Sequence, residues 1–268
     1  MNILVTGAKG FVGKNLCASL KNIRDSKDRT RPALSIGEIF EYDIDTNPEL
    51  LDEYCAKADF VFNLAGVNRP QNPDEFMQGN FGFASKLLDT LKKHGNTCPV
   101  MLASSIQATL IGRYDSDYGR SKKAGEELFF KYAEDTGAKV LVYRFPNLFG
   151  KWCKLNYNSA VATFCHNTAN DLPITVNDSA VCLELLYIDD LVTEMLDALE
   201  GKEHHCEFDG TSTVLCENDD QATVISFVNK LGYDLSEEEL DGVKIFEKSN
   251  PDLLLLARTE RLKRYELE

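Results

Sequence analysis

Short apolar runs alternate with amphipathic segments over the first two thirds of the 268 residues. The apolar runs are almost continuously hydrophobic, which is typical of strands in a parallel sheet that is covered on both faces. They are Ile3 to Thr6, Ile36 to Tyr42, Phe60 to Leu64, Val100 to Ser104 and Val140 to Arg144. Strands that alternate with helices predict an α/β fold, a Rossmann-like, doubly wound parallel sheet.

Helical periodicity fills the spaces between these runs. The predicted helices are Gly10 to Leu20, Phe81 to His94 and Tyr118 to Thr136. In the last one an apolar stripe (Leu128, Phe129, Tyr132) predicts the buried face, and the charged positions predict the face toward water (Lys123, Glu126, Glu127, Glu134).

The rhythm changes at Gly150, where Asn-rich loops begin. A helical stretch at Phe164 to Ala169, a strand at Leu183 to Ile188 and a helix at Asp190 to Leu199 are predicted beyond it. We therefore expect a first domain of residues 1–150, with 183–200 returning to it, and a smaller lobe and tail of residues 151–182 and 201–268. In the tail, Val224 to Leu231 is predicted to be helical.

Composition and charge describe a folded protein with no affinity for polyanions. Hydrophobic residues make up 43% and charged residues 27%, as in ordinary globular proteins. The formal net charge of −14 repels nucleic acids and anionic membranes. The chain starts in an apolar strand without a basic export signal and has no long apolar run, so we expect a cytoplasmic protein with no membrane span.

Eight cysteines are scattered along the chain with no CxxC pair. A chain of this length does not need disulfide staples, so reduced, mostly buried thiols are predicted. The run His204 to Cys206 lacks a second ligand pair at zinc-site spacing, and we expect no metal.

A glycine-rich turn provides the strongest local signal for a cofactor. It follows the first strand directly and opens the first helix, where backbone amides can meet a pyrophosphate. The spacing is GxxGxxG, and the predicted cofactor-binding residues are Gly7, Lys9, Gly10, Phe11, Val12 and Gly13.

Two further strand ends extend this prediction. Asp43 follows the second strand, where a carboxylate accepts hydrogen bonds from ribose hydroxyls and repels a 2′-phosphate. NAD is thus favoured over NADP. Small residues after the third strand leave room for the cofactor, at Leu64, Ala65 and Gly66.

The catalytic candidates are Ser105, Tyr118 and Lys122. Residues four apart share a helix face, so the Lys122 ammonium is expected near the Tyr118 phenol, where a cation lowers the phenol pKa. Ser105 follows the fourth strand, where its hydroxyl can hold a carbonyl. Tyr118 can then exchange a proton with a sugar oxygen while hydride moves to or from nicotinamide.

These elements, in this order, resemble the extended short-chain dehydrogenase/reductase family that acts on nucleotide sugars. The resemblance covers about residues 1–200 and continues in Arg144 to Gly150 and in Leu186 to Leu191, which are similar to the family's RxxNxYG and V-D-D segments. It implies a nucleotide-sugar substrate, a contact from Asn147 to that substrate, and a homodimer built through the helices Phe81 to His94 and Tyr118 to Thr136.

Three segments resemble the reductase domain of the CapF type of capsular polysaccharide proteins more closely: Gly66 to Pro70, Ser104 to Thr109, and Pro146 to Cys153 with Asn156 to Ser159. That resemblance implies reduction, with NAD(P)H, of the 4-keto group of a UDP-linked 2-acetamido-2,6-dideoxy sugar. Members usually carry a C-terminal cupin domain that epimerises the sugar, and that activity is expected to be absent here.

The predicted substrate-binding residues are Arg69, Gln107, Asn147, Lys151 and Asn158. Three features depart from the family. Ser105 and Tyr118 are only thirteen residues apart, Asp43 disagrees with the NADPH of CapF-type relatives, and Glu184 stands where an arginine often meets the substrate pyrophosphate. The phosphate charge would then be met by Arg69, Lys151 or Lys154.

Two alternatives stay open at this stage. The first is a redox-neutral epimerase that retains its nicotinamide; a dehydratase is disfavoured, because Ile106 and Gln107 replace the Asp-Glu pair that removes water. The second is a non-catalytic nucleotide-binding module, against which the complete set of Ser105, Tyr118 and Lys122 argues.

Overall fold

A computed structural model of the chain describes residues 1–68, 70, 72–157, 159–175 and 185–203. The described residues form two compact units: residues 1–145 with 192–203, and residues 146–175 with 185–191. The predicted helix Val224 to Leu231 and the run His204 to Cys206 lie outside the described residues.

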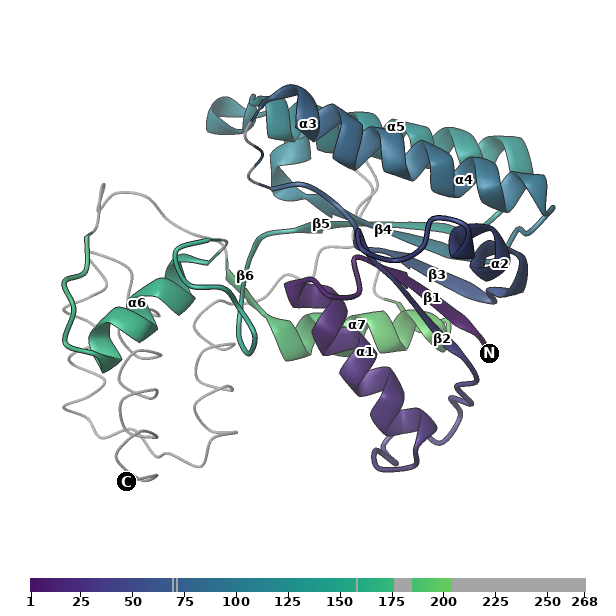
Figure 1. Cartoon of the computed structure of the whole chain (residues 1–268), viewed down its shortest axis with the longest axis horizontal. Helices are drawn as coiled ribbons and strands as arrows, with labels where there is room; N and C mark the ends of the chain where they lie inside the picture. The colour runs from purple at the N-terminus through teal and green to yellow at the C-terminus, as the bar shows by residue number, and fades with distance from the viewer. Residues whose placement is uncertain (69, 71, 158, 176–184, 204–268) are drawn as a thin grey trace. The chain divides into compact units, whose positions relative to one another are not determined.

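The first unit is built on a five-stranded parallel sheet (Figure 1). Its strands are β1 (Ile3–Thr6), β2 (Ile39–Tyr42), β3 (Phe60–Asn63), β4 (Val100–Ser105) and β5 (Val140–Phe145), in the order β2-β1-β3-β4-β5. All four pairings are parallel, so the carboxyl ends of the strands meet at one edge. This confirms the predicted fold class.

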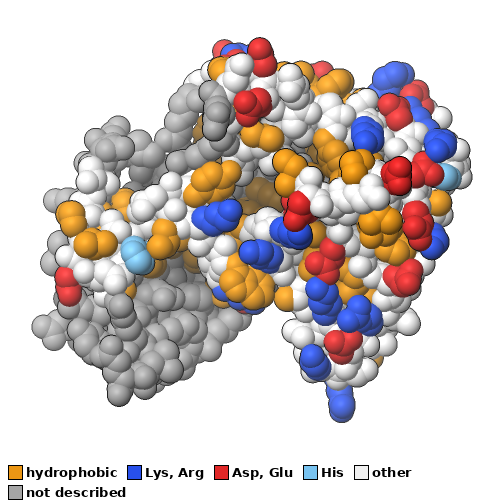
Figure 2. All heavy atoms as spheres, viewed as in Figure 1, with side chains coloured by type: hydrophobic (Ala, Val, Ile, Leu, Met, Phe, Trp, Pro, Cys, Tyr) orange, Lys and Arg blue, Asp and Glu red, His pale blue; other side chains and the backbone are white. Residues whose placement is uncertain are grey.

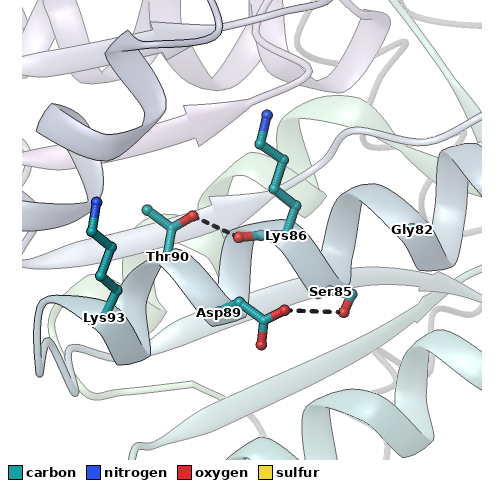
Figure 3. Close-up of a pocket in the computed structure, with 6 residues that line it drawn as sticks. All are labelled: Gly82, Ser85, Lys86, Asp89, Thr90 and Lys93. Atoms are coloured by element: carbon teal, nitrogen blue, oxygen red, sulfur yellow. Dashed lines mark hydrogen bonds between the residues drawn. The ribbon is translucent and has the colours of Figure 1, made fainter.

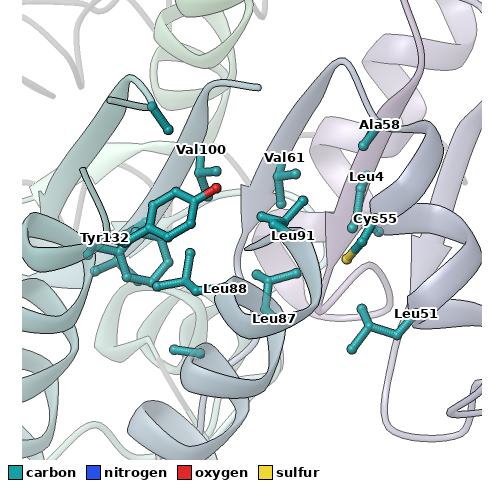
Figure 4. Close-up of a cluster of buried hydrophobic side chains, with 14 of the residues drawn as sticks. Leu4, Leu51, Cys55, Ala58, Val61, Leu87, Leu88, Leu91, Val100 and Tyr132 are labelled. Atoms are coloured by element: carbon teal, nitrogen blue, oxygen red, sulfur yellow. The ribbon is translucent and has the colours of Figure 1, made fainter. Parts of the chain in front are cut away.

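Three helices cover one face of the sheet: α2 (Leu50–Lys57), α4 (Phe83–Lys93) and α5 (Asp117–Thr136). Figure 4 shows the core beneath them, where Leu87, Leu88 and Leu91 of α4 pack among Leu4, Val61 and Val100 of the strands. All six side chains are at most 2% exposed. The short helix α3 (Asp74–Phe76) and a π-helical turn (Met77–Gly82) precede α4.

Helix α1 (Phe11–Arg24) and residues 192–199 of α7 (Ile188–Leu199) lie on the opposite face of the sheet from α4 and α5 (Figure 1). The Tyr143 hydroxyl of β5 donates a buried hydrogen bond to Glu194 of α7 (3.1 Å). Arg31, in the loop after α1, forms ion pairs with Asp197 (2.5 Å) and Glu200 (2.8 Å). These contacts fasten the returning segment to the first unit.

The second unit contains β6 (Asn147–Phe149), β7 (Leu185–Tyr187) and α6 (Ala160–Ala169). β6 and β7 form a separate two-stranded parallel sheet. Gly150 has φ +135°, and a Cβ there would lie 2.4 Å from Ile188 Cγ2, so the turn after β6 requires glycine.

The predicted elements agree with the structure to within a few residues, with the following differences. The strand expected from Ile36 starts at Ile39, and α2 and β6 were not predicted. Glu126, expected to face water, is completely buried, because Arg144 and Ser104 provide polar partners for it inside the protein.

The five cysteines among the described residues are free thiols, and Cys17, Cys55 and Cys165 are buried, as expected. Within the described residues, no helix has the length and apolarity needed to cross a membrane. Figure 2 shows acidic and basic side chains interspersed over the described part of the surface in that view, consistent with many surface ion pairs.

Candidate active site

The glycine-rich turn joins the end of β1 to the start of α1. Gly7 adopts φ +68°, and a Cβ there would lie 2.8 Å from the Ala65 nitrogen. A Cβ on Gly13 would lie 2.2 Å from the Gly7 carbonyl oxygen. Only glycine therefore allows this close approach of α1 and β3 to the turn.

The first turn of α1 leaves amides available for an anion. Its N-cap is Gly10, which offers no side-chain cap, and there is no acidic residue in the first turn. The amides of Phe11, Val12 and Gly13 belong to the group that has no partner inside a helix. A pyrophosphate fits this cradle, which a Cβ would fill, so the residues present fit a dinucleotide cofactor.

Asp43 lies beside this turn, as predicted. Its Oδ2 accepts a hydrogen bond from the Lys9 backbone nitrogen (2.7 Å), and its Oδ1 accepts one from the Ile44 nitrogen (2.8 Å). The Lys9 ammonium forms an exposed ion pair with Asp45. Both carboxylates, Asp43 and Asp45, thus lie just after the end of β2 and bind Lys9 of the glycine-rich turn.

The ends of β1 and β3 are tied together by buried polar side chains. Thr6 Oγ1 donates to Asn63 Oδ1 (2.8 Å) and accepts from the Ala65 nitrogen (3.3 Å). The segment Leu64 to Gly66, predicted to line the cofactor site, is fixed by these bonds next to Gly7.

Asn80, in the π-helical turn, connects this segment to α5. Its Oδ1 accepts from the Val67 nitrogen (2.8 Å), and its Nδ2 donates to Ser121 Oγ (2.9 Å). A Cβ on Gly66 would lie 3.1 Å from Lys122 Nζ, so the Lys122 ammonium is next to this glycine. Asn80 was not predicted; a π-helical turn leaves no distinct sequence pattern, although such turns are frequent at functional sites.

Ser105, Tyr118 and Lys122 come together at the carboxyl end of β4. Ser116 caps α5 by accepting a hydrogen bond from the Gly119 nitrogen (3.0 Å), which fixes the helix start just before Tyr118. The Ser105 side chain is close enough to the Tyr118 hydroxyl to act on its pKa. Lys122 Nζ donates to the Ala103 carbonyl (3.0 Å) and lies 5.7 Å from the centre of the Tyr118 ring.

The protonation of these groups differs from the expectation. Burial raises the pKa of Tyr118 to about 12, while the Ser105 hydrogen bond acts in the opposite direction. Burial lowers the pKa of Lys122 to about 8, against the attraction of Glu126. The phenol pKa is thus raised, whereas the sequence predicted that Lys122 lowers it; burial of the phenol is the main cause of the rise.

The predicted substrate residues fall into separate groups. Gln107 is in the first unit, and its Oε1 accepts from Ser116 Oγ (3.5 Å) at the start of α5. Asn147 and Lys151 are exposed residues of the second unit, and Lys151 pairs with Asp189 (2.9 Å). Arg69 and Asn158 lie outside the described residues, as does Glu184.

A shallow hollow lies on α4 (Figure 3). All of its lining residues belong to α4 except Gly82, which comes just before the helix. Its side chains include Lys86, Asp89 and Lys93. No predicted site residue lines it, and we assign it no part in the reaction.

Comparison with known proteins places the chain in a family. Residues 3–207 match the model of the NAD dependent epimerase/dehydratase family. The chain belongs to this family. The glycine-rich turn and the grouping of Ser105, Tyr118 and Lys122 described above all lie within the matched residues.

Individual members of the epimerase/dehydratase family agree with this. The UDP-2-acetamido-2,6-beta-L-arabino-hexul-4-ose reductase of Pseudomonas aeruginosa is 43% identical over 202 residues, which are 75% of this chain and 50% of that protein. The capsular polysaccharide assembling protein CapF of Staphylococcus aureus is 40% identical, with a TM-score of 0.68, and the match covers 97% of this chain and 66% of CapF. The chain thus spans about half the length of the reductase.

A more distant solved structure shares the fold. The UDP-glucuronic acid 4-epimerase of Bacillus cereus, solved in complex with NAD, is 20% identical, with a TM-score of 0.63 and 99% coverage of both chains. At this identity the match speaks for the architecture alone. The match with CapF, in contrast, covers 97% of this chain at 40% identity, so the resemblance seen first in three short segments extends over nearly the whole chain.

Proposed function

We propose that the chain binds NAD(H) or NADP(H) and reduces the 4-keto group of a UDP-linked 4-keto-6-deoxy, N-acetylated sugar, in the synthesis of a capsular or other surface polysaccharide precursor. The observation that carries this proposal is the grouping of Ser105, Tyr118 and Lys122 beside a glycine cradle. The Pseudomonas reductase and CapF, at 43% and 40% identity, support the substrate class.

The cofactor would be held by the turn Gly7 to Gly13, by Asp43, and by the segment Leu64 to Gly66. Lys122, beside Gly66, would donate a hydrogen bond to the ribose next to the nicotinamide. When bound there, the reduced nicotinamide would supply the hydride for the C4 carbon of the sugar. The cofactor roles of Lys9, Phe11 and Val12 follow from their place in the turn.

The chain's own residues would handle the oxygen of the same carbonyl. The Ser105 hydroxyl donates a hydrogen bond to the keto oxygen and orients it. Tyr118, whose pKa of about 12 keeps it protonated near neutral pH, gives its proton to that oxygen as the C–H bond forms. The products are the 4-hydroxyl sugar and the oxidised cofactor, so two electrons and one proton are accounted for.

Five residues are assigned to the nucleotide sugar in this proposal. They are Arg69, Gln107, Asn147, Lys151 and Asn158. The Lys151 ammonium is exposed and forms an ion pair with Asp189. A diphosphate would compete with that carboxylate for the ammonium.

The direct test is to mix purified protein, NADH or NADPH, and a UDP-linked 4-keto-6-deoxy N-acetylated sugar. Loss of reduced-nicotinamide absorbance with formation of one 4-hydroxyl product supports the proposal. No oxidation of either cofactor would contradict it, provided that the same preparation of sugar is reduced by a known enzyme of this type.

A redox-neutral epimerase is the second candidate, because the description of the matched family names epimerases. Such an enzyme recycles its nicotinamide and tends to keep it tightly bound. Protein purified with stoichiometric NAD, which interconverts 4-epimers and oxidises no added NADH, would favour this candidate over reduction.

We also propose a cytoplasmic homodimer formed through α4 and α5. These helices lie side by side on one face of the sheet (Figure 1), joined by an ion pair between Lys92 and Asp135 (3.1 Å). The free thiols among the described cysteines suit a reducing compartment. A monomeric mass in light scattering at micromolar concentration would contradict the dimer.

A further inference from the structure

Glu126 is a buried carboxylate that the proposed reaction does not use. It lies on α5 and is 0% exposed. Its Oε1 accepts hydrogen bonds from Ser104 Oγ (2.6 Å) and Arg144 Nε (2.8 Å), and its Oε2 accepts one from Arg144 Nη2 (2.7 Å). Arg144, on β5, is 5% exposed, so the two charges form a bidentate pair inside the protein.

This pair is adjacent to every candidate catalytic residue. Three consecutive residues of β4 face α5: the Ala103 carbonyl accepts from Lys122, Ser104 donates to Glu126, and Ser105 acts on the pKa of Tyr118. Glu126 follows Lys122 by one helical turn and therefore lies on the same face. Its contact is the middle one of the three.

The sheet gives this arrangement a fixed register. Ser104 and Arg144 are direct partners in the pairing of β4 with β5. Arg144 and Ser104 thus bind Glu126 from two neighbouring strands. Both sets of hydrogen bonds can form at only one position of α5 along its own axis. A second cation, Lys123 Nζ, lies 3.9 Å from Glu126 Oε2.

Stability alone does not explain an ion pair at this place. Removing two charges from water is costly, and apolar side chains of similar volume often replace a buried pair with no loss of stability. What the bidentate pair provides is a single geometry, because a planar guanidinium and a carboxylate fit together in one orientation.

We propose that Glu126, held by Arg144 and Ser104, is a positioning residue that sets the register of α5 against the end of β4 and so keeps Lys122 and Tyr118 in place beside Ser105. The inference rests on the proposed function for its kinetic consequences. Its structural consequence, the state of Lys122, can be measured without a substrate.

The charge of Glu126 also acts on Lys122. Among the described residues, the titratable groups that face the Lys122 ammonium are Tyr118 and Glu126, and Arg144 acts on it through Glu126. Two further groups near the ammonium do not titrate: Gly66, in the loop after β3, and the Ala103 carbonyl of β4. Loss of the Glu126 charge would leave Arg144 uncompensated and favour the neutral amine of Lys122.

The experiment compares Glu126→Gln with Glu200→Gln. Glu200 also accepts a hydrogen bond from an arginine, Arg31 (2.8 Å), with side chains 9% and 14% exposed, but on the other side of the sheet. Each variant is characterised by its free energy of unfolding in urea, by kcat and KM for the reduction, and by the titration of the Lys122 ¹³Cε resonance, assigned by its loss in Lys122→Met.

We expect both variants to lose stability, and only Glu126→Gln to lose at least about tenfold in kcat, with the KM for cofactor within about twofold. The midpoint of the Lys122 titration should fall by about one pH unit in Glu126→Gln and stay unchanged in Glu200→Gln. A double variant, Glu126→Leu with Arg144→Met, should regain stability but neither the kcat nor the Lys122 midpoint.

Three outcomes would overturn the inference: an unchanged Lys122 midpoint in Glu126→Gln, an equal kcat loss in Glu200→Gln, or a double variant that regains kcat together with stability. If the wild-type protein shows no reductase activity, the proposed function fails, and the Lys122 titration still decides the inference. If Glu126→Gln does not fold, the Lys122 midpoint of the double variant decides it.

Discussion

Lys122 Nζ donates a hydrogen bond of 3.0 Å to the carbonyl oxygen of Ala103, nineteen residues earlier in the chain. The carbonyl belongs to the strand that ends in Ser105, and the ammonium belongs to the helix that presents Tyr118. The cation is therefore held at the end of β4 by the protein itself. A ligand that binds there meets an ammonium that is already oriented.

Tyr118 is the proposed proton donor. Because burial raises its pKa to about 12, the phenol is protonated throughout the neutral range, and Tyr118→Phe removes the donor without changing the charge. We expect kcat to fall by at least about a hundredfold, the share that general acid catalysis supplies. Cofactor affinity, measured by fluorescence titration, should change little.

Tyr54→Phe is the matched control for this variant. Tyr54 lies in α2, away from the site, and its ring stacks on that of Phe40 in β2, with ring centres 4.6 Å apart. It should keep normal turnover. A Tyr118→Phe enzyme within threefold of the parent would show that another group gives the proton.

Lys122 predicts the shape of the pH profile. Its pKa of about 8 means that the ammonium loses its proton as the pH rises through 8, so the rate should fall on that side. Lys122→Met should be slower than the parent below pH 8, and the two rates should converge above it. Lys131→Met, which removes an exposed cation from the same helix, should keep the parent's profile.

The same shift affects stability. An unfolded chain keeps the Lys122 proton up to a pKa of 10.5, whereas the folded chain releases it near 8. Between these values the unfolded state binds more protons, so folding of the parent should gain stability relative to Lys122→Met as the pH rises. Urea unfolding at pH 7.5 and 9.5 measures this, and a parallel response of both proteins would refute the lowered pKa.

Asp43 predicts the choice of cofactor. Its carboxylate lies at the end of β2, fixed by the Lys9 amide, and Ile44 beside it is fully exposed. We expect NADH to be used at least as well as NADPH, and Asp43→Ser with Ile44→Arg to shift the ratio of kcat/KM toward NADPH by about tenfold, or about 1.4 kcal/mol.

Ile44→Ala, which changes no charge, should leave this ratio unchanged. A parent enzyme that strongly prefers NADPH would contradict the assignment. In that case the Lys9 ammonium, freed from Asp45, is the cation at this corner that would meet the 2′-phosphate.

Gly13 and Gly125 test whether the cradle requires glycine. Both are helical, but a Cβ on Gly13 would lie 2.2 Å from the Gly7 carbonyl oxygen, and a Cβ on Gly125 would contact nothing within 4 Å. Gly13→Ala should destabilise the protein by about 1–3 kcal/mol and abolish cofactor binding. Gly125→Ala should stabilise α5 by up to about 1 kcal/mol. Calorimetry with and without cofactor separates the two effects, and equal Tm values would refute this account.

The sequence was sufficient for the parts of the fold that depend on local pattern. The start of β1 and the end of α5 were predicted to the residue, because continuous apolar runs and the Gly137 C-cap, with φ +72°, are local signals. β6, three residues long, has no such signal and exists only because it pairs with β7.

The candidate site was predictable to the same extent. Ser105, Tyr118 and Lys122 follow from motif and spacing. Asn80 and the burial of Glu126 depend on partners far along the chain, Val67 and Arg144, and periodicity placed Glu126 in water. Whether a charged residue of a helix is buried or exposed cannot be predicted from periodicity until its partner on the adjoining strand is known.

The strand order β2-β1-β3-β4-β5 has a consequence for how the protein is made. Once β3 has paired with β1, each later strand joins the same growing edge in the order of its translation. The emerging chain can thus extend its sheet on the ribosome without reopening any earlier pairing. Ser105 is synthesised before Tyr118, and Arg144 on β5 is synthesised after both, so the hydrogen bonds between Glu126 and Arg144 can form only after the rest of this cluster has been made.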